Sequence, residues 1–193
     1  MEQFFLTLAE GFDLPILEWI AAHIRCAFLD VLMPAVTVLG NSGIFWIILA
    51  VLFLCIPKYR KMGLGMGAAL LLGLVCCNLI LKPLCARIRP YDLMELKGTV
   101  INLIINKPHD FSFPSGHTAA SFEAATVIFL HNKKLGIPAL ILASLIAFSR
   151  LYLYVHYPTD VIFGLILGVA LGFLGKFLVG KGYSLYEAKM AAK

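Results

Sequence analysis

The strongest constraint in this sequence is a series of five long apolar runs that are poor in charged residues. These runs cover residues 44–57, 63–81, 118–130, 135–148 and 161–180. A helix that crosses a bilayer needs about 20 apolar residues, and flanking residues can extend the shorter runs toward that length. The runs therefore predict a set of membrane-spanning helices.

The composition excludes an ordinary soluble domain. Hydrophobic residues make up 61% of the 193 residues and charged residues only 14%, far from the balance of a globular protein. The net charge of +5 does not indicate nucleic acid, because the Lys and Arg residues sit in short clusters between apolar runs. The five cysteines show no metal-ligand spacing, and most lie in or beside apolar segments, where Cys behaves as a small hydrophobe.

A sixth, weaker apolar stretch at residues 26–39 is broken by Asp30 and Pro34 and follows an amphipathic stretch at residues 4–20. We therefore expect an all-α integral membrane protein with a bundle of about six transmembrane helices. The alternative is five helices plus an interfacial N-terminal element. The chain is predicted to form a single membrane-embedded domain, residues 1–193, in which residues 1–43 are the amphipathic and first-helix region.

The connections between the runs carry the basic residues that set orientation. Three clusters fall on one side by alternation: Lys58, Arg60 and Lys61; Lys133 and Lys134; Lys181, Lys189 and Lys193. The positive-inside tendency makes this side cytoplasmic. The opposite side, with residues 82–115 and 150–160, is also basic, and those charges need another explanation.

Three short motifs occur on that opposite side. The first runs from Lys82 to Arg89 and Pro90. The second is Pro114-Ser115-Gly116-His117. The third begins with Ser149-Arg150 and continues to His156 and Asp160. Each is weak alone, because a basic residue at a helix end usually reaches toward the membrane interface.

In this order the three motifs resemble the signature of the type 2 phosphatidic acid phosphatase superfamily. The resemblance covers a core of about residues 63–180, with every defining position present. It implies that His156 attacks phosphorus and forms a phosphohistidine, that Asp160 supports His156, and that His117 protonates the leaving oxygen. Arg87 is not part of the family's pattern and is predicted to be a peripheral charge.

The chemistry of these residues agrees with that implication. Phosphoryl transfer needs cations around the equatorial oxygens, an in-line nucleophile and a proton for the leaving group. Lys82, Arg89 and Arg150 can supply the cations, and Arg can bind phosphate through two nitrogens. Ser115 and the Gly116 amide lie at a predicted helix start, which favours anions. Their predicted role is therefore phosphate binding.

The third motif also predicts an oriented histidine. Pro158 is a helix-start signal that places Asp160 in the first turn, within reach of His156 just outside the helix. A carboxylate that holds one imidazole nitrogen orients the other as a nucleophile. His117, His156 and Asp160 could instead ligate zinc or iron, but the three nearby cations would repel a divalent ion. We therefore predict no metal and no cofactor.

The favoured function is hydrolysis of a lipid phosphomonoester or diphosphate at the outer membrane face. Undecaprenyl diphosphate, phosphatidic acid and phosphatidylglycerol phosphate are the candidate substrates, with the bilayer as the other partner and the oligomeric state open. A lipid phosphotransferase would use the same residues. A non-catalytic transport or anion-binding protein is the alternative from another class, although binding alone needs no nucleophile. Size and resemblance favour a bacterial inner membrane.

Two further features are left open by the motifs. Glu123 lies inside a predicted membrane helix, where it is either functional or a hydrogen-bonded group within the bundle. Gly164, Gly168 and Gly172 form a stripe of small residues on the last helix. Such a stripe serves either close packing within the bundle, which we favour, or dimerisation.

Overall fold

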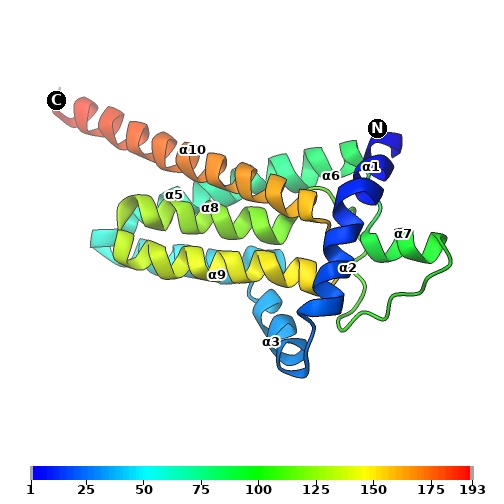
Figure 1. The fold of residues 1–193 in the computed structure, drawn as a ribbon. Coiled ribbons are helices and arrows are strands. Elements are labelled where there is room, and N and C mark those ends of the chain that lie inside the picture. The colour runs from blue at the N-terminus through cyan, green and yellow to red at the C-terminus, as the bar shows by residue number, and fades with distance from the viewer. Residues whose placement is uncertain (1, 192–193) are drawn as a thin grey trace.

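A computed structural model describes residues 2–191, and every regular element in that range is a helix. The prediction of an all-α fold is therefore confirmed for these residues. The bundle in Figure 1 consists of the longer helices α4 (Ile44–Cys55), α5 (Arg60–Gly73), α8 (Gly116–His131), α9 (Lys133–Tyr152) and α10 (Pro158–Ala191).

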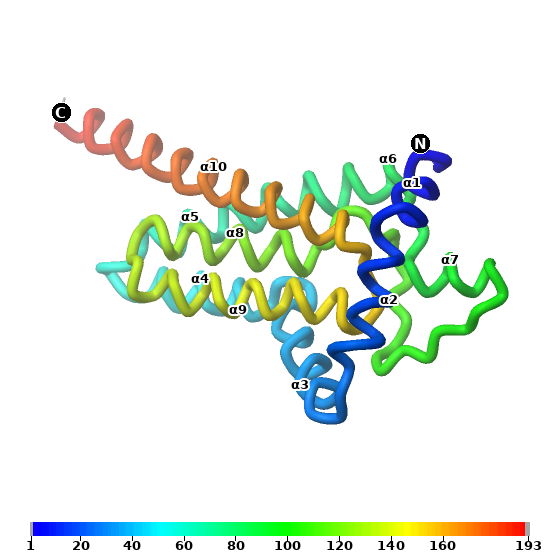
Figure 2. Tube along the Cα trace, viewed as in Figure 1, coloured from blue at the N-terminus to red at the C-terminus, as the bar shows by residue number. Residues whose placement is uncertain are grey.

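Shorter elements surround the bundle. They are α1 (Glu2–Leu8), η1 (Ala9–Asp13), α2 (Leu14–His23), α3 (Ala27–Val38), η2 (Asn41–Gly43), η3 (Pro57–Tyr59), η4 (Leu74–Leu81), α6 (Lys82–Cys85) and α7 (Pro90–Leu96). The π-helical η1 joins α1 to α2, and this N-terminal segment lies across the end of the bundle at which α10 begins (Figure 1). The turns from α4 to α5 and from α8 to α9 lie at the opposite end (Figure 2).

Three helical segments in the described range are long and apolar enough to cross a membrane: Pro57–Leu96, Lys133–Tyr152 and Pro158–Ala191. The pair Ala27–Val38 and Asn41–Cys55, bent by 43°, adds a fourth if it forms one span. Helix α8 has only 16 residues, fewer than the roughly 20 that a full crossing needs. An integral membrane protein is thus supported, while six crossings remain a prediction.

Helix α8 is the central helix of the bundle and packs against α5, α9 and α10. Its inner residues meet side chains of its neighbours in one buried apolar cluster that includes Trp46, Met66, Val127 and Ile146. The Trp46 indole donates a hydrogen bond of 3.0 Å to Ser121 Oγ, so its only polar group is satisfied. The outer faces carry exposed apolar side chains such as Leu71, Ile141 and Phe177, as a lipid-facing surface requires.

The glycine stripe of α10 faces α8. A Cβ atom at Gly164 would lie 2.8 Å from the Ser115 carbonyl oxygen, and one at Gly168 would lie 2.5 Å from the Ala119 carbonyl oxygen. At Gly172 the distance to Thr126 Cβ would be 2.7 Å. The glycines therefore let two backbones approach closely, and the stripe packs within the bundle.

A second buried cluster lies beneath the N-terminal segment. Leu17 of α2 packs there with Leu153, Val155 and Tyr157 from the connection between α9 and α10. Burial of these apolar side chains removes them from water or from headgroups and so holds the segment in place. The N-terminal segment thus covers the end of the bundle where the three motifs meet.

We expect Gly168→Leu to lower the thermal unfolding midpoint of the purified protein in detergent. The new side chain would collide with the α8 backbone, and overpacking typically costs about 1–3 kcal/mol. Gly180→Leu is the matched control, because no atom lies within 4 Å of the Cβ position at Gly180 on the same helix. Equal midpoints for the two variants would contradict this account of the stripe.

Candidate active site

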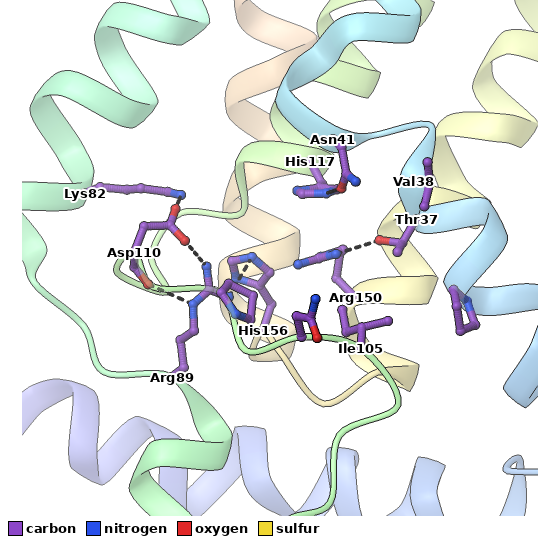
Figure 3. Close-up of a pocket in the computed structure, with 13 residues that line it drawn as sticks. Thr37, Val38, Asn41, Lys82, Arg89, Ile105, Asp110, His117, Arg150 and His156 are labelled. Carbon is purple, nitrogen blue, oxygen red and sulfur yellow. Dashed lines mark hydrogen bonds and ion pairs between the residues drawn. The ribbon is translucent and has the colours of Figure 1, made fainter.

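A cavity of about 370 Å³ opens at the end of the bundle, between the end of α3 and the connection that precedes α8. Five of the residues predicted from the motifs line it: Lys82, Arg89, His117, Arg150 and His156 (Figure 3). Each comes from the end of a helix or from a connection at this end. Residues far apart in the sequence are thereby brought to one place.

His156 lies in the connection between α9 and α10 and is 1% exposed. Its Nε2 is 3.3 Å from Arg89 Nη1. A guanidinium can only donate, so we assign the lone pair to Nε2 and the proton to Nδ1. Burial lowers the pKa of His156 well below its ordinary value, and the positive charges of Arg89 and Arg150 add to this effect. The lowered pKa favours the neutral imidazole, which has an unprotonated nitrogen beside the cavity.

Asp160 lies behind His156, in the first turn of α10, with Oδ2 3.4 Å from His156 Nδ1. The same oxygen accepts hydrogen bonds from Ser112 Oγ at 2.5 Å and from the Tyr157 amide at 3.0 Å. Arg87 Nη1 donates to Oδ1 at 2.6 Å. Both carboxylate oxygens are thus engaged, and Asp160 lies next to the imidazole in the first turn of α10, where the sequence spacing placed it. Its role in supporting His156 remains a prediction.

The prediction that Arg87 is a peripheral charge was wrong. Its side chain is 2% exposed and forms ion pairs with Asp160 and with Asp13, both at 2.6 Å. The sequence alone gives no signal for this position, because the partner Asp13 lies in the N-terminal segment, outside the motif-bearing core. Burial of a charge demands such partners, so Arg87 belongs to the structure of the site.

Arg150 contacts the end of α3, and His117 contacts the segment that joins α3 to α4. Arg150 Nη1 donates to Thr37 Oγ1 at 2.6 Å, and the side chain is buried. His117 Nε2 is 2.9 Å from Asn41 Oδ1. Gly40 leaves room for this imidazole, since a Cβ there would lie 2.7 Å from His117 Cδ2. Thr37 and Asn41 are site residues that the motifs did not identify.

Ser115 and Gly116 do not line this cavity. Ser115 caps α8, with its Oγ 2.9 Å from Thr118 Oγ1 and 3.5 Å from the Thr118 amide nitrogen. Gly116 lies nearer the cations, because a Cβ built there would be 3.9 Å from Lys82 Nζ and 3.2 Å from Asn78 Oδ1. Contact of these two residues with phosphate remains a prediction.

An acidic residue that the motifs also missed, Asp110, binds two of the three cations. Its carboxylate contacts Lys82 Nζ and lies 2.7 Å from Arg89 Nη2 (Figure 3). Partial burial by itself raises the pKa of Asp110, but the Lys82 and Arg89 charges outweigh it and hold this pKa well below its ordinary value. The carboxylate is therefore ionised and occupies the position that an anion would take.

The part of the chain that the structure describes contains no group of three or more His, Cys, Asp or Glu side chains placed to hold a metal ion. Metal-independent chemistry remains a prediction from the cationic character of the site.

We expect Asp110→Asn to increase the affinity for vanadate, a phosphate-like anion, because the variant leaves Lys82 and Arg89 without an internal counter-charge. A partly exposed ion pair contributes about 1 kcal/mol at most, so the dissociation constant should fall by up to about fivefold. Titration calorimetry in detergent measures this change.

Glu95→Gln is the control for the Asp110 prediction, since Glu95 pairs with Lys107 at the surface, 2.9 Å away, and touches no cation of the cavity. Weaker vanadate binding by Asp110→Asn than by the wild type would show that Asp110 assists anion binding rather than competing with it.

Comparison with known proteins identifies the arrangement. The family model of the PAP2 superfamily matches residues 59–181. An undecaprenyl-diphosphatase of Sulfolobus acidocaldarius is 31% identical over 165 residues, which are 85% of this chain and 77% of that protein. The crystal structure of LpxE from Aquifex aeolicus has a TM-score of 0.69 and 29% identity, covering 84% of this chain and 93% of that one.

A second solved structure, a transmembrane PAP2 type phosphatidylglycerolphosphate phosphatase from Bacillus subtilis, has a TM-score of 0.63 and 28% identity, and it covers 93% of this chain and 94% of that one. The family resemblance that the three motifs indicated is thus confirmed over most of the chain. The protein belongs to the PAP2 superfamily and is a membrane phosphatase of that family.

Proposed function

We propose that this phosphatase hydrolyses a lipid phosphomonoester or diphosphate through a phosphohistidine on His156. Undecaprenyl diphosphate is the substrate that we favour over phosphatidic acid and phosphatidylglycerol phosphate. The observation that carries the proposal is the buried, neutral His156 imidazole, whose Nε2 lies beside a cavity lined by Lys82, Arg89 and Arg150. A purely anion-binding site would need the cations but not the oriented nucleophile.

In the first step, His156 Nε2 attacks phosphorus in line with the leaving oxygen. The Nε2–P bond forms and the P–O bond to the lipid breaks, while the three cations hold the equatorial oxygens. His117 gives a proton to the leaving oxygen. In the empty site, burial and the positive charge of Arg150 lower the pKa of His117, and the negative charge of the bound phosphate offsets this and favours the protonated imidazole. Asp160 stabilises the positive charge that the imidazole acquires, through the Nδ1 contact of 3.4 Å.

In the second step, water attacks the phosphohistidine. His117, now neutral, accepts a proton from this water, and the N–P bond breaks to release inorganic phosphate and restore His156. Asp110 must leave Lys82 and Arg89 before the phosphate can bind them, since its carboxylate occupies these cations in the empty site. A phosphotransferase would differ only in using an acceptor hydroxyl in place of water.

A second cavity, of about 870 Å³, supports a lipid as the substrate. It shares Lys82, Asp110 and His117 with the cationic cavity. Beyond them its walls are mainly apolar and come largely from α4, α5 and α8; the apolar side chains include Ile47, Val51, Leu64 and Leu71. Glu123 lies on this wall, buried against Gly73. An alkyl or prenyl chain can occupy this space while its phosphate reaches the cations.

The distribution of charge supports an outward-facing site. The α4–α5 turn, the α8–α9 turn and the C-terminal part of α10, which carry basic residues, lie away from the end of the bundle at which α10 begins (Figure 2). Positive charge of this kind favours the cytoplasmic side. We therefore place the site at the outer face of a bacterial cytoplasmic membrane, where it would meet a lipid phosphate exposed on that face.

The experiment that tests this function is phosphate release from a panel of lipids by the purified protein in detergent, with and without chelator. We expect activity to persist in chelator and to be greatest on undecaprenyl diphosphate. His156→Ala should release no phosphate and form no labelled phosphohistidine, because the nucleophile is gone. His131→Ala is the matched control, since His131 bonds to the Val127 carbonyl at the far end of α8.

Labelled phosphohistidine in His156→Ala would show that the nucleophile is another residue. Preference for a glycerophospholipid would overturn the substrate assignment alone. Transfer of phosphate to an added alcohol at the expense of free phosphate would favour the phosphotransferase.

The role of His117 predicts a dependence on the leaving group. An alkoxide needs a proton to depart, whereas a nitrophenolate leaves more easily without one. His117→Ala should therefore lose more activity on a phosphomonoester lipid than on an aryl phosphate, when phosphoenzyme formation limits the rate. Comparing kcat/KM for the two substrates measures this difference, and an equal loss on both would remove His117 from the role of general acid.

A further inference from the structure

Arg87 is a buried cation held between two carboxylates from opposite ends of the chain. Its Nη2 is 2.6 Å from Asp13 Oδ2 in the N-terminal segment, and its Nη1 is 2.6 Å from Asp160 Oδ1 at the start of α10. All three side chains are at most 2% exposed. Neither Arg87 nor Asp13 lines the cavity, so neither can touch the substrate.

The local structure fixes the guanidinium in this position. Ala86 ends α6 in the left-handed conformation, with φ of 45°, and turns the chain there. The Arg87 carbonyl accepts a hydrogen bond of 2.8 Å from the Ser112 amide. The guanidinium carbon lies 3.8 Å from the centre of the Tyr157 ring and 4.8 Å from that of Phe5. The Arg87 guanidinium is thus held by cation–π contacts as well as by ion pairs.

Asp13 does more than neutralise Arg87. Its Oδ1 accepts a hydrogen bond of 2.9 Å from the Thr159 amide, and its Oδ2 accepts one of 2.8 Å from Thr159 Oγ1. Thr159 directly precedes Asp160 in the first turn of α10, where free amides favour an anion. Asp13 therefore fixes the backbone that carries Asp160 as well as the cation that binds it.

The charge balance of this buried group also favours the third partner. An Arg87–Asp160 pair alone would be neutral, and the guanidinium would weaken Asp160 as a partner for a cationic imidazole. With Asp13 included, the buried group carries one net negative charge next to His156. That charge is suited to stabilise the positive imidazole that forms when Nε2 bonds to phosphorus.

We infer that Arg87 and Asp13 are positioning residues for the reaction, which act by holding Asp160 in its orientation and charge state toward His156. This inference rests on the proposed function, in which His156 is the nucleophile and Asp160 its support. Because Asp13 lies in the N-terminal segment, this segment contributes to the structure of the active site.

The test is a double-mutant cycle measured by the rate of phosphohistidine formation, with KM and the unfolding midpoint recorded for each variant. Arg87→Gln and Asp13→Asn should each lower the rate by about tenfold or more, by analogy with the loss on removal of a partner that orients a metal ligand, with KM nearly unchanged. In an Asp160→Asn background each change should lower the rate less than about twofold, because residues that act through Asp160 lose their effect without it.

Glu10→Gln is the control in both backgrounds. Glu10 lies in the same π-helical turn as Asp13 and pairs with Lys97 of the adjacent connection at 2.5 Å, but at the surface. It should leave the rate unchanged. If Arg87→Gln does not fold, the cycle with Asp13→Asn tests the inference in the same way, because this substitution keeps the shape of the side chain.

Equal effects in the wild-type and Asp160→Asn backgrounds would overturn the inference. The contacts of Arg87 and Asp13 would then stabilise the fold without acting through Asp160. The inference would also be overturned if the variants changed only KM, or if Arg87→Gln and Asp13→Asn both formed phosphohistidine at the wild-type rate. The proposed function fails separately, through a phosphohistidine that persists in His156→Ala.

Discussion

The need to compensate buried charge at one end of an apolar bundle governs this structure. Lys82, Arg89, Arg150 and Arg87 all lie where water is scarce, and an unpaired charge there is costly. The fold meets this need in two ways for three of these cations, whereas Arg150 donates to Thr37 Oγ1 and has no carboxylate partner among the described residues. Arg87 receives permanent carboxylate partners, whereas Lys82 and Arg89 share the more exposed Asp110. The fixed partners hold Arg87 in the structure of the site, whereas in the proposed function the more exposed Asp110 gives up Lys82 and Arg89 to phosphate.

The sequence predicted the helical fold, the family and the residues that meet at the cavity, because apolar runs and short motifs are local patterns. Lys82, Arg89, His117, Arg150 and His156 converge as the motifs indicated. The partners of these residues could not be predicted in the same way. Asp13, Thr37 and Asn41 reach the site only through packing of the first helices onto the bundle. Nothing in the spacing of single polar residues identifies such contacts.

The number of spans shows a related limit of sequence patterns. Apolar length identifies α9 and α10 without difficulty, but α8 is short and lies between other helices. Its small and polar residues, such as Ser121 and Glu123, are buried against neighbours rather than exposed to lipid. A helix that is shielded by the bundle need not carry the composition of one that faces the bilayer. The apolar run at residues 118–130 therefore located α8 but could not establish how the helix crosses.

The contact between Asp13 and the start of α10 has a consequence for how the protein is made. Asp13 accepts hydrogen bonds from Thr159, a residue 146 positions later in the chain. The N-terminal segment leaves the ribosome before its partners, so the Asp13 carboxylate has no permanent cation until Arg87 emerges and no α10 amide to bind until Thr159 does. The catalytic end is thus assembled last during biosynthesis. A nascent chain truncated before α10 would hold several inserted helices but no functional phosphatase.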